Sequence, residues 1–341
     1  MSSATGLPEG VAAAPLPVAE AGTPAWQRWL LVAGGIILAL APLWVLESFH
    51  LFQLTMAVIM ALAVLGLNIV TGYNGQISLG HGAFFAVGAY CTAILMSHFD
   101  WSFWWTLPVS AAVCATIGFG IGFPALRLAG HYLALTTFAL AVAIPQLLKH
   151  KAVEDWTGGV QGLFLMKPDP PAFLPVTPDQ WIYLVVVSIA AVLFFLTWNL
   201  IRGRIGRALM ATRDHPTAAE AMGMDIASLK TKAFAVSALV TGIAGSLSAV
   251  AIEFVAPDSF TIFVSITLFV GMVAGGVASI LGSLFGGLFV LFVPNIAESI
   301  SKAAPGVIYG IILIGLLFVM PDGFAGLLRR LTARLRRGGT S

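Results

Sequence analysis

The feature that most constrains this chain is a run of 52 residues, 48–99, that contains no Asp, Glu, Lys or Arg. A second such run covers the 39 residues 259–297. Soluble domains carry about 25% charged residues, whereas this chain has 9% charged and 59% hydrophobic residues. Too few polar side chains are available to cover a water-soluble surface of this size. The sequence therefore excludes a cytosolic enzyme, a disordered chain and a nucleic-acid binder with a basic face.

These runs predict an all-α polytopic membrane protein. Open sheets leave unpaired edges in lipid, and the apolar runs do not alternate as barrel strands do. A helical crossing needs about 20 apolar residues, because a helix rises about 1.5 Å per residue through about 30 Å of hydrocarbon. We predict ten crossings, the last two short and one of them interrupted by Pro294. They cover residues 29–46, 51–70, 79–97, 104–123, 131–148, 181–201, 233–252, 261–281, 283–298 and 306–320.

The basic residues predict the orientation of these crossings. Six Lys and Arg residues lie in 202–232 and five in 321–341, together 11 of the 17 in the chain. Because cytoplasmic loops are enriched in Lys and Arg, both segments should be cytoplasmic and 149–180 external. An even number of crossings then places both termini inside. We expect a flexible tail at 1–28, a transmembrane domain at 29–320 and a basic tail at 321–341.

The order of the crossings also suggests an internal repeat. Residues 51–148 and 233–320 each hold four predicted helices and start from opposite faces of the membrane. Inverted repeats of this kind are common in transporters, with the substrate path at their interface. The halves share no clear residue identity, so the repeat is predicted from their arrangement alone.

Residues 72–82 join two crossings with a Gly-rich, uncharged segment that carries the amides of Asn74 and Gln76. Irregular backbone at membrane depth is tolerated where protein or water satisfies it. Ser78 is a suitable N-cap for a helix that begins at Leu79, whose N–H groups would then face a path. The alternative is an ordinary interfacial turn, in which these residue types are common.

The same segment contains one histidine, His81, and we find no residue pattern for a metal or cofactor. A single histidine without a second nearby makes no metal site, so a packed or interfacial histidine is the alternative to a proton carrier. The sequence also lacks the Gly-Lys-Ser/Thr of a phosphate loop, a Ser/His/Asp arrangement and an HExxH motif. We therefore expect no cofactor and no catalytic site in this chain.

A second distinctive segment is the hydrophilic stretch 202–232. Its alanines around Glu220 predict a short helix, with Pro216 near its start and Gly223 suited to its C-terminal stop. One interpretation is a solvated loop that only sets topology. The other is a small-faced helix that fits a groove on a partner. A third set of glycines, which we expect to permit close helix packing, comprises Gly271, Gly275, Gly276, Gly282, Gly286 and Gly287.

Taken together, the motifs resemble those of the permease subunits of branched-chain amino acid ATP-binding-cassette importers, the LivM-like family, over about residues 51–328. The strongest matches are Gly66-Leu67-Asn68, Gly75-Gln76-Ile77-Ser78-Leu79-Gly80-His81-Gly82-Ala83-Phe84, Gly88-Ala89-Tyr90, Arg204-Ile205-Gly206-Arg207-Ala208 and Ala219-Glu220-Ala221-Met222-Gly223. Supporting matches are Leu126-Arg127-Leu128, Thr157-Gly158-Gly159 and Gly275-Gly276. The ending Pro321-Asp322-Gly323-Phe324 departs slightly from the usual pattern.

This resemblance implies a non-catalytic, multi-pass subunit of the bacterial inner membrane. Its partners would be two ATP-binding-cassette ATPases, a second related permease, a substrate-binding protein outside and membrane lipid, with no nucleic acid. The solutes would be leucine, isoleucine and valine, and relatives that carry urea or short amides are the alternative. The resemblance places the translocation path at Asn74, Gly75, Gln76, Ser78, Gly80 and His81. It places ATPase coupling at Arg204, Gly206, Arg207, Ala219, Glu220, Ala221 and Gly223.

Two functions of a different class remain open on the residues alone. A secondary transporter would not need the helix near Glu220, and it should carry ionisable groups within its crossings, which are scarce here. A channel would also need no ATPase. Neighbouring genes for ATPases, a second permease and a binding protein would separate these alternatives from an importer.

Overall fold

The computed structural model describes residues 40–125, 131–172, 174–300, 302, 305–320, 322–328 and 330. The chain divides into two compact units, 1–45 and 46–341, and each is described by itself. The described part of the first unit contains the short helix α2 (Pro42–Val45). Most of the predicted crossing 29–46, the tail 1–28, the link around Arg127 and nearly all of the basic arginines of 321–341 lie outside the described residues.

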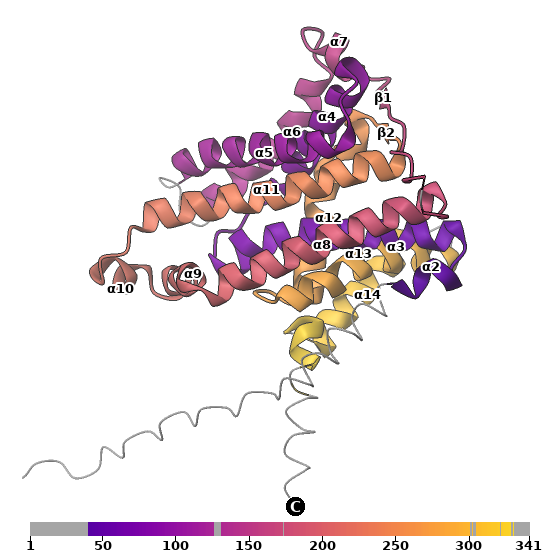
Figure 1. Cartoon of the computed structure of the whole chain (residues 1–341). Coiled ribbons are helices and arrows are strands. Elements are labelled where there is room, and N and C mark those ends of the chain that lie inside the picture. Colours follow the sequence, from indigo (N-terminus) through magenta and orange to yellow (C-terminus); the bar gives the residue numbers. More distant parts are fainter. Residues whose placement is uncertain are drawn as a thin grey trace, which may run out of the picture. The chain divides into compact units, whose positions relative to one another are not determined.

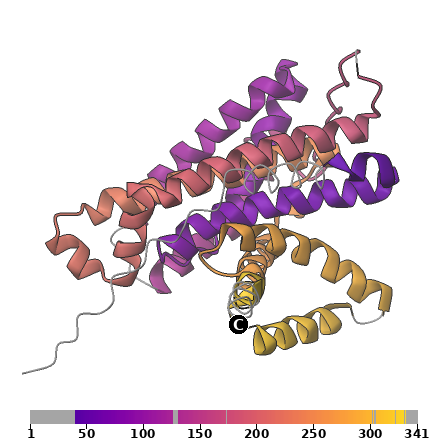
Figure 2. The same cartoon turned by 60° about the horizontal axis from the view of Figure 1, so that its bottom comes forward.

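The second unit consists almost entirely of helices, shown in Figures 1 and 2. Among its described residues, six helices are long and apolar enough to cross a membrane, and α6, α12 and α14 are shorter apolar helices. This agrees with an all-α polytopic membrane protein. The helices are α3 (Ser48–Leu67), the π-helical turn η1 (Asn68–Tyr73), α4 (His81–Phe99), α5 (Phe103–Ala125), α6 (His131–Leu148), α7 (Glu154–Thr157), α8 (Pro178–Arg202), α9 (Arg204–Asp214), α10 (Pro216–Ala221), α11 (Ile226–Ile252), the 3-10 turn η2 (Pro257–Phe260), α12 (Ile262–Gly275), α13 (Ile280–Ile300) and α14 (Pro305–Val319).

Every predicted crossing from 51–70 onward coincides with a helix of this unit, and the main difference is α12. The predicted crossing 261–281 is cut short, because α12 ends at Gly275. Gly276 has a φ of 120° and Ala278 a φ of 55°, conformations that no helix interior adopts. The apolar pattern continues through this turn, so hydropathy alone does not mark where α12 ends. Pro294 lies inside α13, as the sequence predicted.

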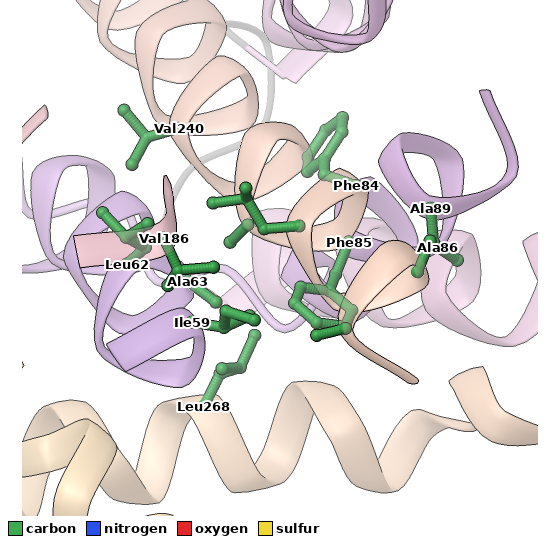
Figure 3. Packing of buried hydrophobic residues seen from close by; sticks show 14 of the residues in the cluster. Ile59, Leu62, Ala63, Phe84, Phe85, Ala86, Ala89, Val186, Val240 and Leu268 are labelled. Carbon is green, nitrogen blue, oxygen red and sulfur yellow. The ribbon is translucent and has the colours of Figure 1, made fainter. Parts of the chain in front are cut away.

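The core is formed where α3 and α11 pack against each other and against opposite groups of helices. α11 contacts α4 and α5 extensively, and α3 contacts α12 and α13. Figure 3 shows this core, with Leu62 of α3, Phe84 of α4, Val240 of α11 and Leu268 of α12 among its buried side chains. The two long central helices therefore organise most of the unit.

Glycines allow the close helix contacts that this packing requires. A Cβ atom on Gly88 would lie 2.0 Å from the carbonyl oxygen of Gly242, and one on Gly245 would lie 1.9 Å from that of Phe85. On the other side of the core, a Cβ atom on Gly275 would lie 1.9 Å from the carbonyl oxygen of Gly282. These distances are too short for any side chain, so α4 meets α11, and α12 meets α13, through backbone. The packing interpretation of the second-half glycines is confirmed.

A two-stranded antiparallel pair lies at one end of α8 and α11. β1 (Leu163–Phe164) pairs with β2 (Phe254–Val255), with Leu163 opposite Val255 and Phe164 opposite Phe254. β2 follows the last residue of α11, and β1 lies in the connection that leads into α8. Helices α9 and α10 lie at the other ends of α8 and α11 (Figure 1). The segments 149–180 and 202–232 are therefore separated by the length of these helices.

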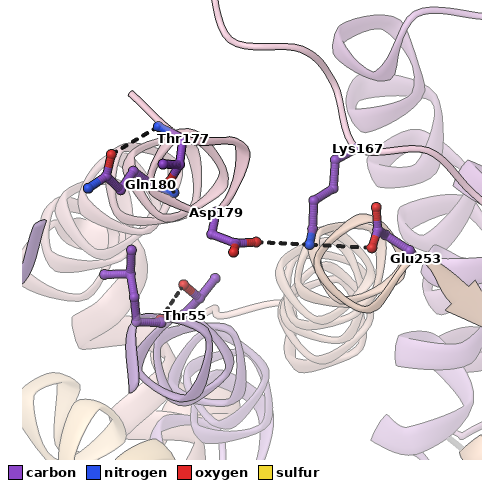
Figure 4. A network of polar contacts seen from close by, with 7 residues as sticks. Thr55, Lys167, Thr177, Asp179, Gln180 and Glu253 are labelled. Atoms are coloured by element: carbon purple, nitrogen blue, oxygen red, sulfur yellow. Dashed lines mark hydrogen bonds and ion pairs between the residues drawn. The ribbon is translucent and has the colours of Figure 1, made fainter. Parts of the chain in front are cut away.

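An ion-pair network ties the β1 connection to the helices, as Figure 4 shows. Lys167 Nζ lies 3.0 Å from Asp179 Oδ1, in the first turn of α8, and 3.4 Å from Glu253 Oε2, at the end of α11. Burial lowers the pKa of Lys167, but the hydrogen bonds and charges of the two carboxylates outweigh it, so its pKa lies above the usual value. A capping box between Thr177 and Gln180 fixes the start of α8 beside this network.

Candidate functional site

The irregular segment that the sequence singled out begins with a change in helix type. α3 continues into the π-helical turn η1, and such turns are frequent at functional sites. The first residue of η1, Asn68, is completely buried. Its Nδ2 donates to the carbonyl oxygen of Ser279 at 2.9 Å and to Ser283 Oγ at 3.0 Å, while Oδ1 accepts from the backbone N–H of Ala278 at 2.8 Å. Asn68 therefore fixes the turn between α12 and α13 against the end of α3.

Asn74 and Gln76 pack inside the chain against the hydrophilic segment. Asn74 Oδ1 accepts a hydrogen bond from Thr212 Oγ1 of α9 at 3.4 Å, and its buried Nδ2 has no partner among the described residues. Gln76 Nε2 donates to the carbonyl oxygen of Lys230 at the start of α11, at 3.4 Å. Between them, Gly75 has a φ of 73°, which favours glycine. The two amides thus face α9 and α11.

Ser78 and His81 form a buried hydrogen-bonded chain with α11. Ser78 Oγ lies 3.0 Å from His81 Nδ1, and His81 Nε2 lies 2.6 Å from Ser237 Oγ. Ser237 Oγ donates to the carbonyl oxygen of Gly66 in α3 at 2.5 Å. His81 is 1% exposed. The histidine therefore links α4, α11 and α3.

The predicted N-cap is wrong. α4 begins at His81, and its N-cap is Gly80 without a side-chain cap hydrogen bond. Ser78 lies too early to cap that helix, and its hydroxyl is engaged by His81 Nδ1. The N–H of Leu79 donates to Thr137 Oγ1 at 3.0 Å and that of Gly82 to Ser265 Oγ at 2.9 Å. The sequence predicts that the N–H groups at this helix start face a path. Side chains of α6 and α12 instead satisfy two of them.

Helix α9 packs on the same end of the core through one face. Its buried residues are Gly206, Leu209 and Thr212, and Leu209 belongs to a small apolar cluster with Tyr73, Ile201 and Ala233. A Cβ atom on Gly206 would lie 1.9 Å from the carbonyl oxygen of Ile201, so only glycine allows the tight step from α8 into α9. Arg204 and Arg207 are exposed. The motif around Gly206 therefore combines a buried glycine with two exposed cations.

Helix α10 presents a small, exposed surface. Ala219 is buried, whereas Ala218, Glu220, Ala221 and Met222 are exposed, Met222 by 81%. Gly223 has a φ of 81°, and its N–H donates to the carbonyl oxygen of Glu220 at 2.9 Å. The N–H of Met224 donates to the carbonyl oxygen of Ala219 at 3.1 Å. These two bonds form a Schellman motif, so the predicted helix and its glycine stop are confirmed.

The structure brings the two candidate sets together through Arg213 of α9. Arg213 Nη1 donates to the carbonyl oxygen of Gly72 at 2.8 Å. A Cβ atom on Gly75 would lie 2.6 Å from Arg213 Cγ. Together with the contact between Thr212 and Asn74, these contacts hold α9 against the backbone of residues 72–75. Gly80 and His81 lie farther along the chain, against α6 and α11.

Four residues at the contacts between segment 68–81 and the helices around it were not predicted as site residues. Asn68 carried a signal, because it is an amide in an apolar helix, where an unpaired polar group is costly. Thr212, Arg213 and Ser237 carried none, since a threonine and an arginine are ordinary in a hydrophilic loop and a serine is tolerated in an apolar helix. Their partners lie 138, 141 and 156 positions away in the sequence.

Comparison with known proteins gives a consistent family. Residues 50–320 match the family described as branched-chain amino acid transport system / permease component. The chain is 32% identical over 282 residues to the high-affinity branched-chain amino acid transport system permease protein LivM of Escherichia coli K12, covering 76% of this chain and 65% of that protein. It is 33% identical over 249 residues to LivM of Salmonella typhimurium LT2, covering 66% and 58%.

The match to a third relative is more distant but longer. The permease protein BraD of Pseudomonas aeruginosa PAO1, from a high-affinity branched-chain amino acid transport system, is 24% identical over 309 residues, covering 82% of this chain and 97% of that protein. No solved structure matches the chain. The chain spans less than two thirds of the length of the two LivM relatives. The match to the family model over residues 50–320 shows that this multi-pass membrane protein belongs to the family of branched-chain amino acid transport system permease components.

Proposed function

We propose that this chain is the membrane-spanning subunit of an ATP-binding-cassette importer in a bacterial inner membrane, where it helps to form the path for leucine, isoleucine and valine. Two ATPases on the cytoplasmic side would hydrolyse ATP, a second related permease would complete the path, and a substrate-binding protein would deliver the solute. The family match and the names of the LivM relatives support the solute class.

The observation that carries the proposal is the contact between α9 and residues 72–75. α10 exposes a small surface with one carboxylate, Glu220, which suits insertion into a groove on an ATPase. Gly206, in the first turn of α9, lies against the carbonyl oxygen of Ile201 in α8 and permits no side chain, and Arg213 holds the carbonyl oxygen of Gly72. A displacement of α10 by an ATPase would therefore be passed through α9 to the irregular segment after α3.

We propose ten crossings with both termini in the cytoplasm, and the positions of the charged segments support this orientation. The basic segment 202–232 and the segment 149–180 lie at opposite ends of α8 and α11, which agrees with the charge distribution. The contacts also fit an inverted repeat: α3 packs on α13 as α11 packs on α5, and α4 packs on α5 as α12 packs on α13. In such a repeat the solute path follows the interface between the halves.

The six candidate path residues fall into two groups according to their contacts. They are Asn74, Gly75, Gln76, Ser78, Gly80 and His81. Asn74 and Gln76 lie beside α9 and α11, where they would sense movement of the cytoplasmic helices. Ser78 and His81 lie between α4 and α11, which belong to different halves. We place the path along this segment, and we assign Gly75 and Gly80 the close backbone approaches that their contacts require.

A test of coupling uses the complete transporter in proteoliposomes. We expect Glu220→Lys to leave assembly and basal ATP hydrolysis intact and to abolish the stimulation of ATP hydrolysis by binding protein loaded with leucine, because the reversed charge would repel the groove. Lys232→Glu, which reverses an exposed charge on α11 outside α9 and α10, is the matched control and should behave as wild type. Normal stimulation in Glu220→Lys would refute the coupling assignment.

The solute class needs a separate measurement. Uptake into the same proteoliposomes should require ATP and the binding protein, and should be competed by leucine, isoleucine and valine. Competition by urea or acetamide instead would favour the amide alternative. Uptake without ATP that follows an ion gradient would indicate a secondary transporter, and uptake without either would indicate a channel.

A further inference from the structure

A cavity of about 300 Å³ lies at the end of α8 that adjoins α9, beside the turn between α12 and α13 that Asn68 fixes. Its walls come from the last turn of α8, the start of α13 and the short helix after residue 322. Most of the lining is apolar, and it includes Ile201, Leu281 and Phe285. Because α8 is an apolar helix long enough to cross a membrane, a cavity at its end lies at the membrane interface.

Arg202 is the one cation among the described residues that line this cavity. Arg202 lines it, is exposed, and has its Cζ 4.1 Å from the centroid of the Trp198 ring. A guanidinium stacked on an indole is held in place while its N–H groups remain available. Arg202 forms no ion pair with any acidic residue that the structure describes. Its charge is therefore open to an anion from outside the chain.

The surroundings favour an anion that also has an apolar part. Trp198 is 37% exposed and Leu281 52% exposed at this cavity, so a small hydrated anion would leave apolar surface in water. Exposed Arg204 and Arg207 lie on the adjoining helix. The sequence after Leu328, another wall residue, contains five arginines in residues 329–337. Basic pockets beside transmembrane helices on the cytoplasmic side bind anionic lipid headgroups.

We propose that this cavity binds an anionic phospholipid of the cytoplasmic leaflet, with the phosphate on Arg202 and an acyl chain between α8 and α13. Arg202 would give the charge selectivity, since a guanidinium binds phosphate oxygens in a bidentate fork. Trp198 would hold the guanidinium, and Leu281 and Phe285 would contact the acyl chain. This site does not depend on the proposed transport cycle or its solute, and only its assignment to the cytoplasmic leaflet rests on the proposed orientation.

Native mass spectrometry of the purified full-length chain tests the proposal. Phosphatidylglycerol and phosphatidylcholine with identical acyl chains are added in turn to wild type, Arg202→Gln and Lys151→Gln. We expect Arg202→Gln to bind phosphatidylglycerol about fivefold more weakly, which corresponds to about 1 kcal/mol for one interfacial cation. Lys151→Gln, which removes an exposed cation at the opposite end of α8, should bind as wild type. Equal losses in both variants, or equal binding of the two lipids by wild type, would overturn the site.

A second measurement does not depend on any variant. Phosphatidylglycerol with a photoreactive acyl chain should label wild-type peptides that contain Leu281 or Phe285, and unlabelled phosphatidylglycerol should compete. Glycerol phosphate, which has the headgroup chemistry without the chains, should not compete. Full competition by glycerol phosphate would show a simple anion site, and labelling spread evenly over all helices would show ordinary surrounding lipid. Either result would overturn the proposal.

Discussion

His81 Nε2 lies 2.6 Å from Ser237 Oγ, whose single hydroxyl proton is donated to the carbonyl oxygen of Gly66 at 2.5 Å. Ser237 must therefore accept from His81, so Nε2 carries a proton. The imidazole is buried, and no described carboxylate pairs with it, so a charged ring would be costly. His81 is thus the neutral tautomer with Nδ1 unprotonated, and Nδ1 accepts from the Ser78 hydroxyl.

This arrangement predicts the effect of removing the acceptor. Ser237→Ala should destabilise the protein by about 1–3 kcal/mol, because it leaves the buried Nε2–H of His81 unpaired. The measurement is thermal unfolding of the purified protein in one detergent. Ser248→Ala, another buried serine of α11 that lies outside this hydrogen-bonded chain, is the control and should shift the midpoint less. Equal shifts in the two variants would argue that the hydrogen bond to His81 contributes nothing.

The helices were predictable because membrane spans depend on the length of apolar sequence. The run 131–148 coincides with α6, and 306–320 differs from α14 by one residue at each end. The short helix around Glu220 was also readable, since Gly223 permits the left-handed stop that ends it. The residue types within each segment determine such helices and their ends, so these features can be predicted from the sequence.

The site was less predictable because its contacts join distant segments. Ser78 has the residue type of an N-cap, but the chain folds so that His81 engages its hydroxyl and Gly80 takes the N-cap position of the helix. Likewise, the amides of Asn74 and Gln76 meet α9 and α11, which the loop sequence alone does not indicate. Polar residues in an apolar segment indicate that partners exist, whereas the identity of the partners depends on tertiary packing.

The contact between α4 and α11 predicts opposite results for two glycines. Gly88→Ala should destabilise the protein by about 1–3 kcal/mol, because the new Cβ would lie 2.0 Å from the carbonyl oxygen of Gly242 and force the helices apart. Gly120→Ala should be neutral or stabilising by up to about 1 kcal/mol, because its Cβ would meet no atom within 4 Å and alanine favours helix. Thermal unfolding of both variants provides the comparison, and similar destabilisation by both would contradict the close contact.

The charge distribution predicts the sidedness of the loops. Reporter fusions at residue 165 should be active outside the membrane, and those at residues 215 and 335 in the cytoplasm. Residue 165 follows β1 and residue 215 joins α9 to α10, at opposite ends of α8. Paired phosphatase and fluorescent-protein reporters at each position give complementary signals. A cytoplasmic signal at residue 165 would refute the orientation with both termini inside.

Cysteine accessibility tests whether the segment after η1 adjoins the solute path. Asn74, Gln76 and Ser78 are 2%, 7% and 1% exposed, so cysteines there should react slowly with a water-soluble thiol reagent in the resting transporter. Trapping ATP hydrolysis should change their reactivity if movement of α9 opens this segment. The experiment uses the assembled complex with Cys91 and Cys114 of this chain replaced by alanine.

The exposed Ile77, 43% accessible in the same segment, supplies the matched control. A cysteine at this position should react readily from the cytoplasm in every state, which reports access to the loop without access to the path. Reagent added from the outside should reach position 74, 76 or 78 in one state of the cycle, because a path opens to each side in turn. If all three instead react like position 77, from the cytoplasm and in every state, the segment is an interfacial turn and the path runs elsewhere.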